Sequence, residues 1–438
     1  MLPLFFLRRE KYAAGFWQRL GHIPVLRQNG MPVIWIHCVS VGETNAAVPL
    51  IKALNAEFPD FRIVISTTTK TGQEIAQKLF SDTANLIFYF PFDWKFTVRR
   101  VLKKIKPNII LLMETEIWFN FIREAKTTGT QVFIVNGRIS EKSAARYLKI
   151  RNIMGRVLRF VDLALMQTTA DAQRLLRLGI NPKKVRVTGN VKFDQPPIAK
   201  ENVFLSYFLE RFEITPENPL IVAASTHAPE EEWILTAFKK IHKNSAGLLP
   251  RLLIAPRHPE RFAEVAELVA KSGLKLVKRS SPLSLEDVSA DVILLDSIGE
   301  LRQIFALAEI VFVGGSLIRH GGQNILEPAI ARKAIITGHH TMNFAEIIKK
   351  FEKNEALIRL PELKENEIPL KLAGVFQELL QNEEKRRKIA DNAARMLEEN
   401  RGATDRTLNF LRPVLQVQLS KNFVSGNPAN PVKSEITV

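Results

Sequence analysis

The sequence predicts an α/β protein with two Rossmann-like domains that face each other across a cleft, each built on a parallel sheet. Short apolar runs rich in β-branched residues alternate with amphipathic segments, a pattern typical of parallel sheets covered by helices on both faces. The alternation pauses once, in a proline-containing stretch between about residues 192 and 218. At 438 residues the chain has room for two or three domains.

The strands of the first half are apolar runs four to seven residues long in most cases, followed by polar or glycine-containing turns. We predict them at Val33–Val39, Arg62–Ser66, Leu86–Phe90, Ile109–Met113, Gln131–Val135, Leu163–Gln167 and Val185–Val187. Amphipathic segments lie between several of them, and Thr44–Asn55 has helical spacing. The first half therefore predicts one complete α/β domain.

The second half repeats this pattern after the proline-containing stretch. Its strands are predicted at Leu220–Ala224, Arg251–Ala255, Lys275–Val277, Val292–Leu295, Ile310–Val313 and Ala334–Thr337. The connection between the halves contains Pro196, Pro197, Pro216 and Pro219 around an amphipathic piece, Asn202–Phe212. We predict a first domain over residues 1–200 and a second over 201–412.

The C-terminal end combines a long charged amphipathic segment with a polar tail. Glu383–Leu411 is predicted to form a terminal helix. Beyond Arg412 the composition shifts to Ser, Asn, Pro and Val, which predicts a disordered tail over residues 413–438.

The composition and charge limit the classes of partner and of binding site that we expect for this protein. The formal net charge of +17 favours an anionic partner: nucleic acid, a phospholipid surface or a phosphorylated substrate. The bases are spread along the chain, and we predict no nucleic-acid role. A single cysteine, Cys38, excludes a disulfide framework and a Cys-rich zinc site. No compact metal-ligand motif and no P-loop occurs, and the first strand is not followed by G-x-G-x-x-G, so we predict no metal and no ordinary dehydrogenase.

The N-terminus begins with a short apolar run, Met1–Leu7, followed by Arg8, Arg9 and Lys11. The run is far shorter than the ~20 residues that span a bilayer, and no cleavage site of a secretory signal follows. Apolar residues ahead of bases suit the interface of an anionic membrane. The alternative is a frayed, partly buried start.

The most distinctive stretch of the chain is Gly314–Pro328, which follows a predicted strand and leads into a helix-like segment. Glycines allow close backbone approach and leave amide N–H groups free. A strand, a Gly-rich turn and a helix start together can form an anion cradle. We therefore expect a nucleotide at the carboxyl ends of this sheet.

Two acidic loops follow strands of the first half. Ser40-Val41-Gly42-Glu43 fits the capping-box pattern, in which Glu43 would only satisfy backbone N–H groups. In the alternative interpretation Glu43 acts as a general base toward a substrate hydroxyl. Glu114 and Glu116 follow the strand Ile109–Met113; they could position cations or stabilise positive charge, or be two solvated loop acids.

Several further strand-end loops combine polar residues with a base or a glycine. They are Asn136–Ser140, Gly189–Asp194, Ala224–His227, Pro256–Arg261, Ser297–Leu301 and Gly338–Phe344. Arg257 can fork onto phosphate oxygens, and the Ser297–Leu301 loop could hold a base or a phosphate. Loops of this kind at one sheet edge are hard to explain by stability alone.

Taken together, these motifs resemble the 3-deoxy-D-manno-octulosonic acid (Kdo) transferase family of lipopolysaccharide assembly. The resemblance runs from about Tyr12 to Leu411. Its carriers are Trp35–Glu43, Met113–Trp118, Asn136–Ser140, Gly189–Asp194, Pro256–Phe262, Gly314–Ala329 and Thr337–Ile347. The family implies a GT-B type fold, CMP-Kdo as donor, a lipid A precursor (lipid IVA) as acceptor, inversion at the sugar, no cofactor and no metal. It also implies a location at the cytoplasmic face of the inner membrane.

The resemblance also implies roles for single residues. Glu43 resembles the general base, while Glu116 (or Glu114) and Lys192 resemble the groups that support the transition state. The loops that resemble the CMP-binding segments contain Arg257, His258, Ile298, Gly299, Glu300, Asn324, Ile325, Leu326 and Glu327. The resemblance implies an acceptor-binding first domain and a donor-binding second domain. Two features depart from the family pattern: a longer N-terminal anchor is usual, and proline is common where this chain has His339.

Two alternative functions remain open on the sequence alone. Another two-domain nucleotide-sugar enzyme, such as a different glycosyltransferase or an epimerase, would share the fold. A two-lobed protein that binds a ligand without chemistry would not need Glu43.

Overall fold

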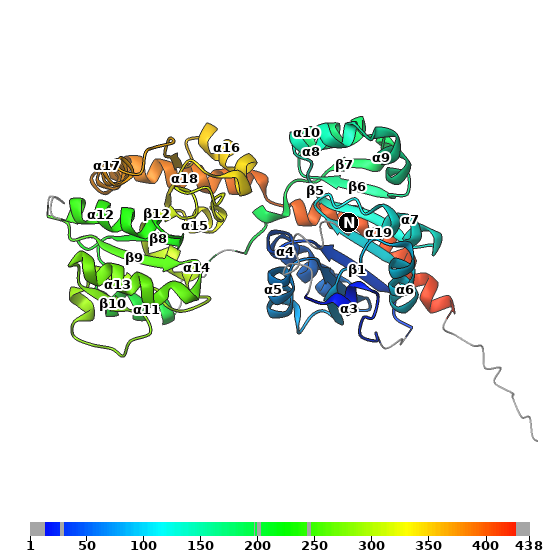
Figure 1. Cartoon of the computed structure of the whole chain (residues 1–438), viewed down its shortest axis with the longest axis horizontal. Helices are drawn as coiled ribbons and strands as arrows, with labels where there is room; N and C mark the ends of the chain where they lie inside the picture. The colour runs from blue at the N-terminus through cyan, green and yellow to red at the C-terminus, as the bar shows by residue number, and fades with distance from the viewer. Residues whose placement is uncertain (1–13, 27–29, 197, 199–202, 243–246, 426–438) are drawn as a thin grey trace, which may run out of the picture. The chain divides into compact units, whose positions relative to one another are not determined.

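The computed structural model describes residues 14–26, 30–196, 198, 203–242 and 247–425. These residues form two compact units. The N-terminal unit is the chain up to Gln195 together with the chain from Asn400 onward, and the C-terminal unit is Pro196–Glu399. Each is an α/β unit with one sheet (Figure 1), so the predicted fold class is confirmed.

The N-terminal unit contains a parallel sheet in the order β3-β2-β1-β4-β5-β6-β7. Its strands are β1 (Val33–Cys38), β2 (Arg62–Thr67), β3 (Leu86–Tyr89), β4 (Ile109–Met113), β5 (Gln131–Gly137), β6 (Leu163–Met166) and β7 (Val185–Val187). Its helices are α3 (Phe16–Arg19), α4 (Val41–Glu57), α5 (Lys70–Phe80), α6 (Lys95–Ile105), α7 (Phe119–Thr127), α8 (Glu141–Leu148), α9 (Arg151–Leu158), α10 (Thr169–Arg177) and α19 (Ala403–Ser425). Every predicted strand of the first half is present.

The C-terminal unit contains a second parallel sheet, in the order β10-β11-β9-β8-β12-β13-β14. Its strands are β8 (Leu220–Thr226), β9 (Arg251–Pro256), β10 (Leu276–Lys278), β11 (Val292–Leu294), β12 (Ala308–Val313), β13 (Ala334–Thr337) and β14 (Ile358–Arg359). Its helices are α11 (Val203–Arg211), α12 (Glu230–His242), α13 (Phe262–Ser272), α14 (Leu301–Ile304), α15 (Leu326–Ile330), α16 (Ala345–Lys353), α17 (Ile368–Gln381) and α18 (Glu383–Asn400). Only the two-residue β14 was not predicted, because so short an edge strand leaves no apolar run.

The central strands are readable from sequence because both faces of each sheet are covered. Every residue of β1, β2 and β4 is buried, so these strands contain runs of consecutive apolar residues rather than an alternation of apolar and polar ones. One core cluster of the N-terminal unit includes residues of α6, α7 and α9, and another includes residues of α4, α5 and α19. The helices therefore lie on both sides of the sheet (Figure 1).

The C-terminal end differs from the prediction. Glu383–Leu411 is not one helix: α18 ends at Asn400, and Gly402 adopts a φ of +82° before α19 begins. Leu408, Leu411 and Leu415 of α19 are buried in the core cluster that α4 lines. Residues 400–412 thus belong to the N-terminal unit, and the predicted boundary at 412 is wrong.

The predicted disorder of residues 413–438 is wrong for 413–425, which are helical in α19; residues 426–438 lie outside the described part of the chain. Arg412 pairs with Glu57 of α4, and Asp194 accepts the Gly402 N–H at 2.7 Å. Both contacts join residues that lie far apart in the sequence. They stabilise a segment whose local composition is polar. The first unit ends at Gln195, close to the predicted 200.

Both sheets have a point at which the chain order reverses. In the N-terminal unit β1 lies beside β4, and in the C-terminal unit β8 lies beside β12. Ligands of open α/β sheets bind at the carboxyl ends of the strands at such a switch point. The loops after β1 and β4, and those after β8 and β12, are therefore where each unit is expected to bind its ligand.

Among the described residues, no helix is both long enough and apolar enough to cross a membrane. The N-terminal run that predicts membrane contact lies outside the described residues.

Candidate active site

Glu43 sits in the first turn of α4, directly after β1 at the first switch point. Its Oε2 accepts the Val39 N–H at 2.6 Å, and Ser40 Oγ donates to Oε1 at 3.2 Å. The Ser40 hydroxyl in turn accepts the Glu43 N–H at 3.5 Å. The predicted capping arrangement is thus present, and it fixes the position of the carboxyl group.

The environment of Glu43 is unlike that of an ordinary cap. Burial raises the pKa of Glu43 to about 8; the charge of Glu114 adds to the shift, and the Val39 N–H opposes it. Burial, and then the charge of Glu114, raises the pKa of Glu116 to about 7. Mutually repelling acids that are buried or half-buried at a switch point are typical of functional sites, because stability alone disfavours them. The Glu43 carboxyl group therefore caps α4 and also belongs to an acid cluster of the kind found at functional sites.

Glu114 and Glu116 differ in their partners. Glu114 accepts a hydrogen bond from Lys192 Nζ at 2.8 Å. Within the described residues Glu116 forms no ion pair. Glu114 also has a φ of +55°, an uncommon conformation for a non-glycine residue that is found at functional sites. The structure therefore brings Lys192 to Glu114, the residue that the resemblance named as the alternative to Glu116.

Lys192 is held in place by the motif Asn136-Gly137 at the end of β5. The buried Asn136 Oδ1 accepts the Val191 N–H at 3.1 Å, and Asn190 Oδ1 accepts the Lys192 N–H at 3.0 Å. Two predicted strand-end loops are thus joined, and together they aim an ammonium group at the acid cluster.

The acid cluster predicts a pH-dependent stability. The pKa of Glu43 rises from its ordinary value of 4.5 to about 8, so the folded state binds more protons than the unfolded state between these values. Stability must then fall as pH rises through that window. We expect Glu43→Gln to raise the melting temperature relative to wild type at pH 8.5, and to raise it less at pH 5. Equal differences at both pH values in thermal denaturation would contradict the buried-acid interpretation.

The Gly-rich loop after β12 differs from the prediction that its amide N–H groups are free to bind an anion. Its amides are not free: the buried carboxylate of Glu230, the first residue of α12, accepts four backbone N–H groups. Glu230 Oε2 accepts those of His227 at 3.0 Å and Gly315 at 2.7 Å, and Oε1 those of Ser316 at 3.0 Å and Leu317 at 2.9 Å. Burial raises the pKa of Glu230 to about 7, and these donors oppose the shift. The first part of the predicted anion cradle therefore already holds an internal anion.

A cluster of basic residues lies beside this loop. The ring of His227 is 4.0 Å from that of His320 and 5.3 Å from that of His258, centroid to centroid. Burial, together with the nearby basic groups that include Arg257 and Arg261, lowers the pKa of His227 to about 4, so its ring is neutral near pH 7. Positive groups gathered at a strand-end edge suit a phosphate. The predicted residues Arg257 and His258 are thus brought together with His227 and His320.

The remaining predicted donor-binding residues lie in the loop before α14 and where the Gly-rich loop enters α15. Ile298 is 68% exposed, and Glu300 pairs with Arg279 at 3.0 Å. Asn324 donates to Glu327 at 3.2 Å, and burial raises the pKa of Glu327. The side chains of Ile325 and Leu326 are fully buried in the core, which leaves only their backbone for a ligand.

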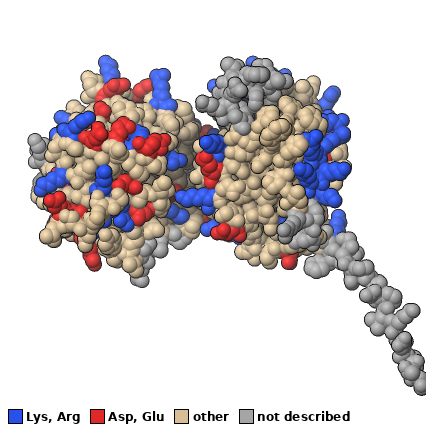
Figure 2. All heavy atoms as spheres, turned by 60° about the horizontal axis from the view of Figure 1, so that its bottom comes forward, with Lys and Arg blue, Asp and Glu red and all other residues tan. Residues whose placement is uncertain are grey.

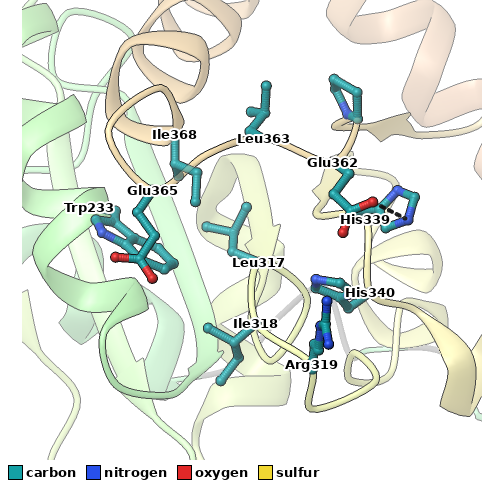
Figure 3. A pocket seen from close by; sticks show the side chains of 11 residues that line it. Trp233, Leu317, Ile318, Arg319, His339, His340, Glu362, Leu363, Glu365 and Ile368 are labelled. Carbon is teal, nitrogen blue, oxygen red and sulfur yellow. Dashed lines mark ion pairs between the residues drawn. The ribbon is translucent and has the colours of Figure 1, made fainter.

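A pocket of about 340 Å³ opens next to the Gly-rich loop (Figure 3). The lining residues include Trp233, Leu317, Ile318, Arg319, His339 and His340. Figure 3 shows Arg319 and His340 side by side at one end of the pocket and Trp233 at the other. The predicted loops Gly314–Pro328 and Gly338–Phe344 contain the bases of this pocket, but Trp233 and Glu230 were not predicted as site residues. The available signal for Glu230 was an acid three residues after His227, at the start of a helix.

Comparison with known proteins decides the family. A family model for 3-deoxy-D-manno-octulosonic-acid transferases matches residues 14–195. A 3-deoxy-D-manno-octulosonic acid transferase of Haemophilus influenzae is 34% identical over 383 residues, which cover 87% of each chain. The chain belongs to the Kdo transferase family.

The solved structures that resemble this Kdo transferase family member show its fold. A glycosyltransferase from Rickettsia africae matches with a TM-score of 0.55 at 15% identity, over 89% of this chain and 99% of that one. A UDP-GlcNAc 2-epimerase from Neisseria meningitidis, bound to UDP-GlcNAc, matches with a TM-score of 0.54 at 14% identity, over 84% and 99%. Both the predicted family and the predicted GT-B type fold are confirmed.

Proposed function

We propose that this protein transfers Kdo from CMP-Kdo to a hydroxyl group of a lipid A precursor such as lipid IVA, with inversion at the sugar. One observation carries the proposal: in a chain of the Kdo transferase family, Glu43, Glu114 and Glu116 lie at the first switch point, where burial and then the charge of Glu114 raise the pKa of both Glu43 and Glu116. Enzyme chemistry explains this arrangement, and fold stability does not.

In the N-terminal unit, which we propose binds the acceptor, Glu43 removes the proton of the attacking hydroxyl. A general base works best when its pKa lies near the working pH, and that of Glu43 is raised to about 8. Direct attack of the activated hydroxyl on the anomeric carbon inverts the configuration there. Glu116 favours the oxocarbenium-like transition state. Lys192 neutralises Glu114, which limits the repulsion that the ionised Glu43 must overcome.

In the C-terminal unit, which we propose binds the donor, the cations beside His227 stabilise the phosphate of the departing CMP. Arg257 and His258 are exposed and free to reorient onto it. The half-buried Glu327, oriented by Asn324, accepts hydrogen bonds from ribose hydroxyls. Arg319, one residue before His320, lines the adjoining pocket and faces the carboxylate of the sugar acid.

The test is a transfer assay with purified protein, CMP-Kdo and lipid IVA, read by product mass. We expect product ions heavier by one or more Kdo residues, and none when UDP-sugars replace CMP-Kdo. Conversion of a UDP-sugar without an acceptor would instead support the epimerase alternative. Binding of CMP-Kdo without any transfer would support the two-lobed binding protein.

We further propose that the protein acts on an anionic membrane surface through an aromatic–basic surface, formed by Phe16, Trp17, Phe92, Trp94 and Phe96 together with the bases of α6. Trp17 is 67% exposed and Phe96 56% exposed. Their rings are linked through the others, from Phe16–Trp17 at 5.8 Å to Trp94–Phe96 at 5.6 Å.

Helix α6, whose sequence is KFTVRRVLKKI, has bases but no acid. Figure 2 shows Lys and Arg gathered along the edge of the N-terminal unit where α6 and α7 lie in Figure 1. Amphipathic aromatic rings beside clustered bases are typical of contact with anionic headgroups. This clustering also departs from the even spread of bases inferred from the sequence.

Removal of the exposed aromatic rings should weaken membrane binding. We expect Trp17→Ala/Phe96→Ala to reduce the affinity for vesicles containing phosphatidylglycerol, measured by co-sedimentation, by roughly a hundredfold or more, because each ring contributes about 1.5–3 kcal/mol when buried. Leu79→Ala on α5, also an exposed apolar residue, is the matched control. Unchanged vesicle binding in the double variant, or equal competition by single-stranded nucleic acid, would contradict a membrane role for this surface.

A further inference from the structure

A second apolar surface lies where α8 meets α9, away from the aromatic–basic surface in the sequence. Three aliphatic side chains are exposed there: Leu148 at 41%, Ile150 at 45% and Ile153 at 50%. They are near neighbours in the chain, whereas exposed apolar residues are ordinarily scattered singly. Adjacent apolar side chains left in water are typical of a binding surface.

Bases alternate with these aliphatic residues. Arg146, Lys149 and Arg151 are all exposed, and within the described part of the chain none of them forms an ion pair. From Lys142 to Val161 the sequence has no acidic residue. Unpaired bases next to aliphatic side chains complement a ligand that is both anionic and apolar.

The same segment adjoins the acid cluster. The loop that leads into α8 is tied to the acidic loop after β4, because the Arg138 N–H donates to Thr115 Oγ1 at 2.8 Å. Tyr147 of α8 packs against the same core cluster as Ile117 and Trp118, which follow Glu116 in the chain. Burial, and then the charge of Glu116, raises the pKa of Tyr147. A ligand on this surface would therefore bind a segment that is tied to the acidic loop after β4.

We propose that Leu148, Ile150 and Ile153, with Arg146, Lys149 and Arg151, form the acceptor-docking surface. An acyl chain of the lipid acceptor lies along the aliphatic side chains, and an acceptor phosphate binds the bases. The inference rests on the proposed function and extends it, since it says how the N-terminal unit recognises a phosphorylated, acylated sugar. A bilayer would also suit apolar and basic residues, but proximity to Glu116 favours the reacting lipid itself.

The decisive experiment compares two acceptors in detergent micelles, without a bilayer: lipid IVA, and the same phosphorylated disaccharide with its acyl chains removed. For Ile150→Asp/Ile153→Asp we expect the KM for lipid IVA to rise tenfold or more. The KM for CMP-Kdo should stay within about twofold of wild type, and the KM for the deacylated acceptor should rise less than that for lipid IVA. Leu79→Asp on α5 is the matched control, because Leu79 is equally exposed (40%) but lies on another helix of the same unit.

The bases are tested separately. Lys149→Ala/Arg151→Ala should raise the KM for both phosphorylated acceptors by several-fold, and should not change that for an acceptor from which the phosphates have been removed. Circular dichroism and thermal melting confirm folding; if the aspartate variant does not fold, Ile150→Ser/Ile153→Ser replaces it.

The outcomes separate this inference from the proposed function. If wild type transfers Kdo and the variants keep the wild-type KM for lipid IVA, the docking surface is wrong and the function stands. Loss of vesicle binding alone, with an unchanged KM in micelles, overturns the inference in favour of a bilayer contact. A changed oligomeric state in the variants, with an unchanged KM, overturns it in favour of contact between copies of the chain. No transfer by wild type would overturn the proposed function itself.

Discussion

Glu43→Gln is expected to lower the turnover number for Kdo transfer by a hundredfold or more, while CMP binding stays unchanged. The loss follows from removal of the general base, a contribution of about 10²–10⁴ in rate. Glutamine retains an oxygen that can still accept the Val39 N–H, so the start of α4 remains capped. The substitution therefore separates the two roles of this carboxyl group. The measurement is steady-state kinetics together with CMP titration by calorimetry.

The matched control for Glu43 is Glu57→Gln at the other end of the same helix. Glu57 pairs with Arg412 of α19, far along α4 from the acid cluster, and its substitution should leave turnover within about twofold of wild type. Full activity in Glu43→Gln would mean that the residue only caps α4, and the proposed mechanism would then be wrong.

Glu230→Ala is expected to lower stability more than any other single substitution considered for the C-terminal unit. It leaves four buried N–H groups without their acceptor, and each unsatisfied buried group costs roughly 1–3 kcal/mol when water cannot fully replace the partner. A total loss of about 3 kcal/mol or more would lower the melting temperature by roughly 6–12 °C in a unit of this size. Nucleotide affinity should fall as well, because the loop that carries His320 loses its anchor.

Glu232→Gln provides the control for Glu230. Glu232 lies in the same first turn of α12 but is exposed, so its substitution should change the melting temperature by less than about 2 °C. Added formate should partly restore Glu230→Ala by occupying the vacated amides. A melting temperature for Glu230→Ala within the range of the control would show that the loop does not depend on this carboxylate.

The sequence could predict most of the fold because buried parallel strands are local features. β4, for example, is an unbroken apolar run, and all of its residues are buried. It also predicted which loops follow the strands at one edge of each sheet, because the carboxyl ends of parallel strands share that edge. α19 could not be predicted as part of the N-terminal unit, since its contact with α4 joins segments more than three hundred residues apart, as in Arg412–Glu57.

The sequence by itself determined the two parallel sheets, the loops at their edges and the family. It also marked Glu43 as a capping residue and as a candidate general base. Tertiary structure decided that Lys192 pairs with Glu114, and that the Gly-rich loop gives its amides to Glu230. It also set the pKa of Glu43 near 8. The physical reason is that a charge or an N–H group takes its partner and its hydration from whatever folding brings close. The local sequence pattern predicts the backbone conformation, but it does not predict which groups from distant parts of the chain become neighbours.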